Sequence, residues 1–224
     1  RVVDNALRDF HLAGVALDTD RKARFKAIMG ELAQLGARFE QNVLDATNDW
    51  KLHITDRDEL AGLNEAILES AAQRAHAAGL HGWTMTLDQP TYVAVLTDCE
   101  SRQLRRAYYE AWSTRASDQG PSAGRWDNTQ VIEQIVKLRH EAARLLDFPS
   151  YAEYALSTRM ARSLTEVTDF LQQLALAARP AAQREYAELE AFAGEPLEVW
   201  DVGFYAERLQ RSRYSVSQEE LRPW

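Results

Sequence analysis

The sequence predicts a mainly α fold of several helical layers with one small two-stranded β element. Apolar residues recur at helical spacing over most of the chain, and only two short stretches alternate apolar and polar residues. Glycine and proline number only 10 and 6 among 224 residues, which argues against an all-β chain with many tight turns. The length suffices for one large domain or two small ones with a buried core.

The longest helical pattern covers residues 21–46, and a shorter helix is predicted before it over 4–13. Apolar residues in the long pattern step by three or four positions, so they share one helix face. The residues at 18–20 supply N-cap oxygens and first-turn carboxylates. The predicted core face consists of Phe25, Ile28, Leu32, Leu35, Phe39 and Val43.

Two strands are predicted at residues 50–55 and 83–87, because each stretch alternates apolar and polar side chains. Neither would be stable alone, so we expect them to pair as an accessory sheet. Between them, Asp56 and Glu59 have capping-box spacing, which predicts a helix from there to about Ala78.

Residues 88–224 are predicted to form one helix after another. Pro90 suits the first turn of a helix that reaches about Asp98. The elements expected after it are a helix over 101–116 with core residues Leu104, Tyr108 and Trp112; a loop over 117–126; a helix over 128–146 with core residues Ile132, Ile135, Val136, Leu138, Ala142 and Leu145; helices opened by the capping boxes Ser150/Glu153, Ser163/Glu166 and Ser217/Glu220, the second kinked or broken at Pro180; and a helix over 201–213.

Composition excludes several classes of protein. Lys plus Arg number 26 and Asp plus Glu 34, a net charge of −8, whereas nucleic-acid binders usually carry a basic surplus. No apolar run approaches the roughly 18–20 residues that span a bilayer, so neither a nucleic acid nor a membrane is expected as a partner. A single cysteine, Cys99, cannot form an internal disulfide and fits a reducing compartment, which predicts a cytoplasmic location.

No residue in the sequence is predicted to be catalytic, cofactor-binding or metal-ligating. The segment from His140 to Arg144 begins like the zinc motif His-Glu-x-x-His, but it ends in an arginine that cannot bind a metal. Phosphate-binding loops, dinucleotide fingerprints and Gly-x-Ser-x-Gly elbows are missing as well. We expect structural or solvated positions for all five histidines, which are His11, His53, His76, His81 and His140.

Three further features have a functional and a structural interpretation. Glu185, Glu188 and Glu190 are expected on a solvated helix face. Residues 104–109 combine basic and aromatic groups, as in a nucleic-acid contact, but the acidic net charge favours a charged face beside a core stripe. Residues 200–205 could line a ligand cleft, and an aromatic helix start packed in a core is the favoured interpretation.

Matches to a known family run through the whole chain in order and at natural spacing. They include residues 7–17 (LRDFHLAGVAL), 39–47 (FEQNVLDAT), 82–92 (GWTMTLDQPTY), 138–146 (LRHEAARLL) and 220–223 (ELRP). In these segments the chain resembles the thimet oligopeptidase family of zinc metallopeptidases, in its bacterial oligopeptidase A branch. It departs from the family pattern at Asn64, where a proline is usual, and at Trp224, where a tyrosine is usual.

The resemblance implies a part of a larger, helical, channel-type metallopeptidase that hydrolyses short peptides with zinc. Residues 1–95 would belong to its N-terminal helical region, and residues 96–224 would begin its catalytic region. The family's His-Glu-x-x-His motif is absent from this sequence, so the chain itself is expected to bind no zinc and to be inactive. Both ends suggest an excised piece, and apolar surface left uncovered predicts self-association. The alternative is a non-enzymatic helical interaction module of shared ancestry.

Overall fold

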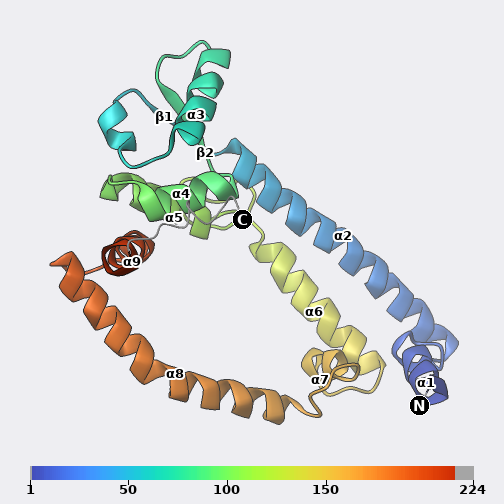
Figure 1. Ribbon diagram of the computed structural model, residues 1–224. Helices are drawn as coiled ribbons and strands as arrows, with labels where there is room; N and C mark the ends of the chain where they lie inside the picture. The colour runs from blue at the N-terminus through green and yellow to red at the C-terminus, as the bar shows by residue number, and fades with distance from the viewer. Residues whose placement is uncertain (1, 215–224) are drawn as a thin grey trace. The chain divides into compact units, whose positions relative to one another are not determined.

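The computed structural model describes residues 2–214, and this part of the chain is mainly α-helical with one small sheet, as predicted (Figure 1). In chain order the elements are α1 (Val2–Leu12), α2 (Thr19–Asp49), β1 (Lys51–Ile54), the 3₁₀ turn η1 (Arg57–Leu60), α3 (Glu65–Ala77), β2 (Trp83–Thr86), α4 (Gln89–Asp98), α5 (Arg102–Ser113), α6 (Thr129–Leu145), α7 (Tyr151–Leu156), α8 (Leu164–Ala193) and α9 (Val199–Tyr214). The predicted capping box Ser217/Glu220 and Trp224 lie outside the described residues.

Two compact units make up the chain, and each has its own hydrophobic core. Within the described residues, unit 1 combines 2–42 with 128–179, and unit 2 combines 43–127 with 180–214. These units are defined by packing, whereas the regions 1–95 and 96–224 are implied by the family resemblance. The division into those two regions stays a prediction. The core of unit 1 contains Phe25, Ile28, Leu138, Ala142 and Leu146; that of unit 2 contains Ile54, Leu60, Leu63, Leu68, Ala71, Met85, Leu87, Val95, Cys99, Leu104, Tyr108 and Ala111.

In unit 1, α2 and α6 supply the core residues. Phe25 and Ile28 are buried, which confirms the start of the predicted apolar face of α2, and the rest of that face is half-buried. On α6, Leu138 and Ala142 are buried as predicted. The prediction is wrong for Ile132 and Val136 of the same helix, whose exposed fractions are 48% and 60%. Their spacing places them toward a side of α6 that no described element of unit 1 covers.

In unit 2, the two predicted strands form the expected antiparallel pair. Lys51 lies opposite Thr86 and Ile54 lies opposite Trp83, and α3 packs against β2. The strand pair buries Ile54, Thr84 and Met85. The Oη of Tyr108 on α5 donates a hydrogen bond to the carbonyl of Thr86 at 3.0 Å, which fastens the sheet to the helices.

The helix predicted to run from Asp56 to about Ala78 is wrong in its first part. Asp56 does cap a helical turn, because its side chain accepts from the backbone N–H of Asp58, but that turn is the short η1. The chain then reverses at Gly62, where φ is +91° and a Cβ would collide with the carbonyl oxygen of Asp98. A new N-cap, Asn64, opens α3 by accepting from the backbone N–H of Ile67 at 3.1 Å. The departure from the family pattern at residue 64 thus has a local structural role.

Most other helix limits follow the predicted signals. Asp88 caps α4 with Pro90 in the first turn, Ser150 caps α7, and the Oγ of Ser163 accepts from the N–H of Glu166 at the start of α8. Residues 117–126 contain no helix or strand, which confirms the loop. Helix α8 continues through Pro180, so the proline does not break it. A proline inside a helix removes one backbone hydrogen bond, and the turns on either side maintain the helix.

Candidate functional site

The most polar buried feature of unit 2 is an ion-pair cluster that joins α5 to α9. Asp201 is completely buried near the start of α9, and its carboxylate accepts hydrogen bonds from two arginines of α5. Arg105, with 2% of its surface exposed, donates from Nη2 to Oδ1 at 2.8 Å. Arg102 donates to Oδ2 from Nη2 at 2.6 Å and from Nε at 2.9 Å. Three charged side chains, 102, 105 and 201, therefore converge on one point between the two helices.

The surroundings of the cluster satisfy most of its polar groups. The Nη1 of Arg105 donates to the carbonyls of Cys99 and Glu100 at 2.8 and 3.1 Å. The carboxylate of Asp201 also accepts from the backbone N–H of Glu198 at 3.1 Å, in the manner of a capping-box acid. Asp201 is the carboxylate that pairs with the buried Arg105. Removing Asp201 would therefore leave Arg105 with an uncompensated charge in the core.

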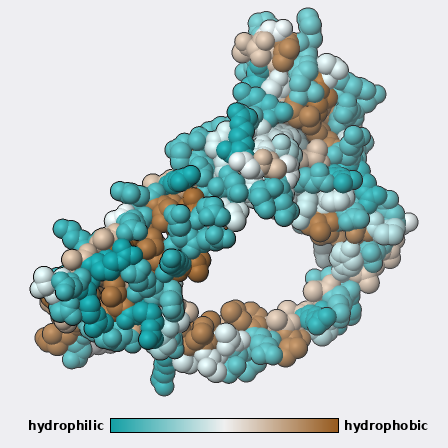
Figure 2. Space-filling view, turned by 180° about the vertical axis from the view of Figure 1, so that it is seen from behind, coloured by the Kyte–Doolittle hydropathy of each residue, from teal (hydrophilic) through white to brown (hydrophobic). Residues whose placement is uncertain are grey.

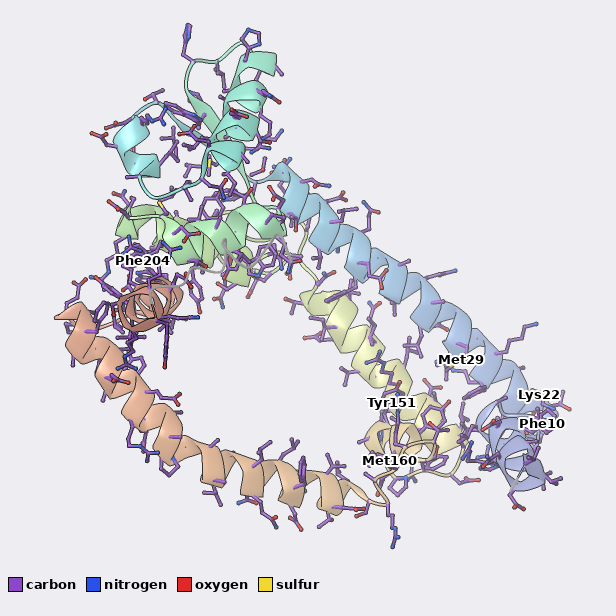
Figure 3. All side chains as sticks on the ribbon, viewed as in Figure 1. Phe10, Lys22, Met29, Tyr151, Met160 and Phe204 are labelled. Carbon is purple, nitrogen blue, oxygen red and sulfur yellow. The ribbon has the colours of Figure 1, made fainter. Side chains whose placement is uncertain are left out.

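Aromatic rings extend the contact between α5 and α9. Phe204, labelled on α9 in Figure 3, is buried. The guanidinium groups of Arg105 and Arg208 lie 3.9 and 3.4 Å from its ring centre. Trp200 lies beside Tyr109 with ring centres 5.9 Å apart. These contacts support the core interpretation for Trp200 and Phe204, whereas Val202 of the same stretch lines a groove.

The buried cluster depresses the pKa of Asp201. Burial is the strongest influence and favours the neutral acid, but the hydrogen bonds from Arg102, Arg105 and the N–H of Glu198 together outweigh it, so the pKa lies below its ordinary value. A group with a lowered folded-state pKa stabilises the fold above its unfolded pKa, and that contribution is lost as the pH falls through the folded value.

Acidification is therefore expected to weaken unit 2 through Asp201 as the pH falls below about 4. The measurement is urea unfolding by circular dichroism between neutral pH and about pH 3, in the parent chain and in Asp201→Asn. The parent should lose more stability over this interval than the variant, which has no carboxyl to protonate. Equal pH dependence of the two chains would contradict this role of Asp201.

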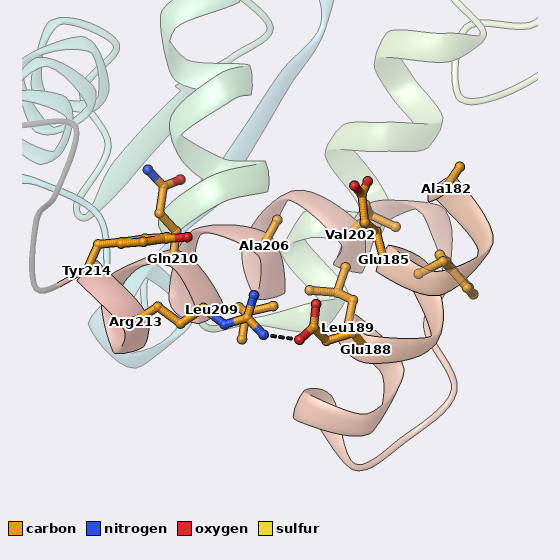
Figure 4. A pocket seen from close by; sticks show the side chains of 11 residues that line it. Ala182, Glu185, Glu188, Leu189, Val202, Ala206, Leu209, Gln210, Arg213 and Tyr214 are labelled. Atoms are coloured by element: carbon orange, nitrogen blue, oxygen red, sulfur yellow. Dashed lines mark hydrogen bonds and ion pairs between the residues drawn. The ribbon is translucent and has the colours of Figure 1, made fainter. Parts of the chain in front are cut away.

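A groove of about 690 Å³ opens beside this cluster, between the second half of α8 and α9 (Figure 4). Its floor is apolar, with Leu189 and Val202 among its residues, and an ion pair between Arg213 and Glu188 lies at its edge. Glu188 and Glu185 are exposed, as predicted, and they belong to this edge. Among the described residues that line the groove there is no histidine, cysteine, serine or threonine, so they offer a largely apolar floor without a nucleophile and base pair.

The histidines do not assemble into a metal centre within residues 2–214. All five are exposed, and no group of three or more His, Cys, Asp or Glu side chains that could hold a metal ion is found in this part of the chain. In the near-motif, Glu141 forms a two-pronged ion pair with Arg24 of α2 at 2.6 and 2.7 Å. Glu141 thus joins α6 to α2, and the described residues do not fit a zinc site.

Sequence reasoning missed the buried ion pair. Residues 104–109 were expected to form a charged face beside a core stripe, and this is correct for the exposed Arg106 but wrong for Arg105, which is buried. Two signals were available: Arg102 and Arg105 are three residues apart on one helix face, and Asp201 occupies the third position of a helix. Neither signal shows that Arg105 and Asp201 are partners, because the two residues lie 96 positions apart in the sequence.

Cys99 is a free, buried thiol, and burial raises its pKa above the ordinary value. Within the described residues, no helix is both long enough and apolar enough to cross a membrane. These findings leave a helical chain with a buried polar cluster and an apolar groove.

Comparison with known proteins identifies the class to which this helical scaffold belongs. The profile of peptidase family M3 matches residues 95–224, which is more than half of the chain. The chain belongs to peptidase family M3.

Relatives match the chain from end to end. Oligopeptidase A of Escherichia coli strain K12 is 46% identical over 229 residues, and that of Salmonella typhimurium is 47% identical; each alignment covers 100% of this chain and 34% of the relative. Dipeptidyl carboxypeptidase of Escherichia coli is 30% identical over 230 residues, with 33% of its length covered. The chain thus spans about a third of the length of the curated relatives it matches.

Proposed function

We propose that this chain is a structural part of a zinc metallo-oligopeptidase of family M3, whose full-length form hydrolyses short peptides in an internal channel. The observation that carries the proposal is the end-to-end similarity to oligopeptidase A at 46–47% identity, with only 34% of the relative covered. In this role the 224 residues provide scaffold and channel wall, and the catalytic centre belongs to the remaining two thirds.

The described architecture supports a scaffold role. Each unit has its own apolar core, and the buried residues described above serve to hold helices together. The match of the family profile begins at residue 95, which supports residues 96–224 as the start of the catalytic region and residues 1–95 as part of the N-terminal helical region.

Zinc, the metal that the family resemblance implies, finds no group of three or more potential ligands among the described residues. A zinc site needs three or four N, S or O ligands within about 2.0–2.3 Å of one point. None of the five exposed histidines belongs to a group of three or more potential ligands in the described structure, and Glu141 of the near-motif is bound to Arg24. We therefore derive no catalytic step from these residues and assign zinc binding to the rest of the full-length protein.

The substrates proposed for the full-length protein are short, unfolded peptides, because a channel admits only chains that can thread into it. We place the protein in the cytoplasm, without nucleic-acid or membrane partners, in agreement with its acidic composition and single buried thiol. If the full-length enzyme digested folded proteins and ignored peptides of about ten residues, the threading argument would be wrong.

The isolated 224-residue chain is expected to bind no zinc tightly and to hydrolyse no peptide, even with zinc added. Residues 2–214 contain no group of three or more potential metal ligands that could hold a zinc ion and its activated water. Elemental analysis after dialysis and a fluorogenic-peptide assay test this, with full-length oligopeptidase A from Escherichia coli as the positive control. Stoichiometric zinc with chelator-sensitive turnover by the 224 residues would overturn the assignment.

The apolar groove between α8 and α9 favours a second candidate, a non-enzymatic helical interaction module. The source reading frame separates the two functions. A frame that encodes His-Glu-x-x-His after these residues supports the peptidase, and a stop codon shortly after Trp224 supports the module.

A further inference from the structure

The three methionines of this chain differ widely in exposure. Met85 on β2 is completely buried, Met29 on α2 is 37% exposed, and Met160 is 99% exposed. Methionine is an apolar residue that usually fills gaps in a core, so a methionine in full contact with solvent is unusual. Met160 lies in the segment between α7 and α8, and Figure 3 labels it together with Met29. Its thioether sulfur is therefore open to small molecules in solution.

Hydrogen bonds fix the backbone on both sides of Met160. The N–H of Arg159 donates to the carbonyl of Leu156, the last residue of α7, at 2.8 Å. The N–H of Arg162 donates to the carboxylate of Glu166, in the first turn of α8, at 2.7 Å. The segment is thus attached to both helices, while the side chain of Met160 is left in solvent.

The exposure of other apolar residues has no comparable chemical consequence. Hydrophobic residues reach the surface along α8 (Figure 2), where Phe170, Leu171 and Leu174 are each more than half exposed. Their side chains contain only carbon and hydrogen, which dilute hydroperoxides do not attack. A thioether sulfur carries lone pairs that do react, and methionine sulfoxide is the product.

We propose that Met160 is a modification site, at which hydroperoxides oxidise the thioether to the sulfoxide in the folded chain. With hydrogen peroxide, a sulfur lone pair attacks one peroxide oxygen, a sulfur–oxygen bond forms and the oxygen–oxygen bond breaks. The sulfur loses two electrons and the peroxide gains them. The departing hydroxide takes the proton from the transferred oxygen and leaves as water. The proposal goes beyond the proposed peptidase function and does not depend on it.

The other sulfur atoms of unit 2 are protected from the same reaction. Met85 and Cys99 are both completely buried in its core. The Sγ of Cys99 donates to the carbonyl of Glu59 at 3.5 Å, and burial raises the pKa of this thiol, which disfavours the reactive thiolate. An oxidant reaches either sulfur only in molecules whose core has opened.

Oxidation at Met160 is expected to leave the fold intact. A sulfoxide is polar and disrupts packing when it forms inside a core. Met160 contributes almost no buried surface, and the added oxygen faces water, which satisfies its hydrogen bonds. The same exposure keeps the sulfoxide accessible to methionine sulfoxide reductases, so the modification is reversible without unfolding.

The test is the rate of oxygen incorporation at each methionine of the 224-residue chain in dilute hydrogen peroxide, followed by peptide mapping and mass spectrometry. Met160 should react at least about 100-fold faster than Met85, because a core residue reacts only in the small fraction of molecules that have opened. Met29 should react at an intermediate rate. In concentrated urea the three rates should become similar, which calibrates the intrinsic reactivity of the three side chains.

Met160→Leu is the matched variant, because leucine is apolar and of similar volume but has no sulfur. It should abolish the fast reaction and leave the rates at Met29 and Met85 unchanged. Circular dichroism of the parent chain should show constant helix content while Met160 is oxidised. Two methionine sulfoxide reductases, one for each epimer of the sulfoxide, should then restore the original mass of the folded chain.

Four results would overturn the proposal. They are a rate at Met160 no higher than that at Met29 or Met85 in the folded chain, a fast reaction that persists in Met160→Leu, a loss of helix content that accompanies oxidation of Met160, and a Met160 sulfoxide that the reductases repair only after the chain has been unfolded in urea. The first two would show that Met160 is not the site of oxidation. The last two would show that its side chain belongs to a packed surface of the folded chain.

Discussion

Asp201→Ala is expected to destabilise unit 2 by about 3–5 kcal/mol, because it removes the only carboxylate that contacts the guanidinium of buried Arg105 at hydrogen-bond distance in the described structure. The variant also loses the acceptor for Arg102 and for the N–H of Glu198 at the start of α9. The loss is a large fraction of the roughly 5–15 kcal/mol that stabilises a typical domain. Urea unfolding followed by circular dichroism measures it.

Two control variants separate the stability contributed by the buried charge pair from that of the other contacts of Arg102 and Asp201. Glu195→Ala removes an ion pair with the same Arg102, at 3.1 Å but 41% exposed on each side, and the acceptor of the Tyr205 Oη hydrogen bond at 2.9 Å, and should cost about 1–2 kcal/mol. Asp201→Asn keeps the shape of the side chain and an oxygen acceptor, so its cost should fall between those of the two alanine variants. An Asp201→Ala chain as stable as Glu195→Ala would show that the buried pair does not hold α9 on α5.

Tyr108→Ala is expected to cost about 3–5 kcal/mol, the range for deleting a large buried aromatic side chain. Tyr108 is completely buried at the centre of the unit 2 core, and its ring meets Trp50 edge-on with centres 4.8 Å apart. The alanine would leave a cavity between α5 and the sheet. Thermal unfolding of the variant and the parent chain measures the loss.

Tyr108→Phe is the matched control, because it keeps the ring and removes only the hydroxyl. Burial raises the pKa of the phenol, so its proton remains available to the carbonyl of Thr86. Losing that bond should cost about 1 kcal/mol. If the phenylalanine and alanine variants were equally destabilised, the hydrogen bond, not ring packing, would be the main contribution of Tyr108.

The elements that the sequence predicts well are those fixed by local interactions. The face of α2 that begins with Phe25 and Ile28, and the caps Asp88 and Ser150, each depend on residues a few positions apart. The strand pair was predictable because alternation marks both partners. The helix from Asp56 failed because Gly62 reverses the chain beside Asp98, a contact that local spacing does not reveal.

The candidate site depends on contacts distant in sequence, and these escaped prediction. Helical spacing identified Leu104 and Tyr108 as core residues, but an arginine between them is expected outside unless its buried partner is known. That partner, Asp201, belongs to another helix. Val136 shows the opposite failure, because it was predicted to be buried and is exposed. Helical spacing identifies it as an apolar core position, but no described element of its unit covers it.

The division into two units has a spectroscopic consequence. Five tryptophans, at positions 50, 83, 112, 126 and 200, belong to the described part of unit 2, and the described residues of unit 1 contain none. Indole emission from these five residues, excited near the red edge of protein absorbance, therefore reports on one unit, while far-ultraviolet ellipticity reports on the helices of both. Where the two signals change at different denaturant concentrations, the difference between them measures how independently the units unfold.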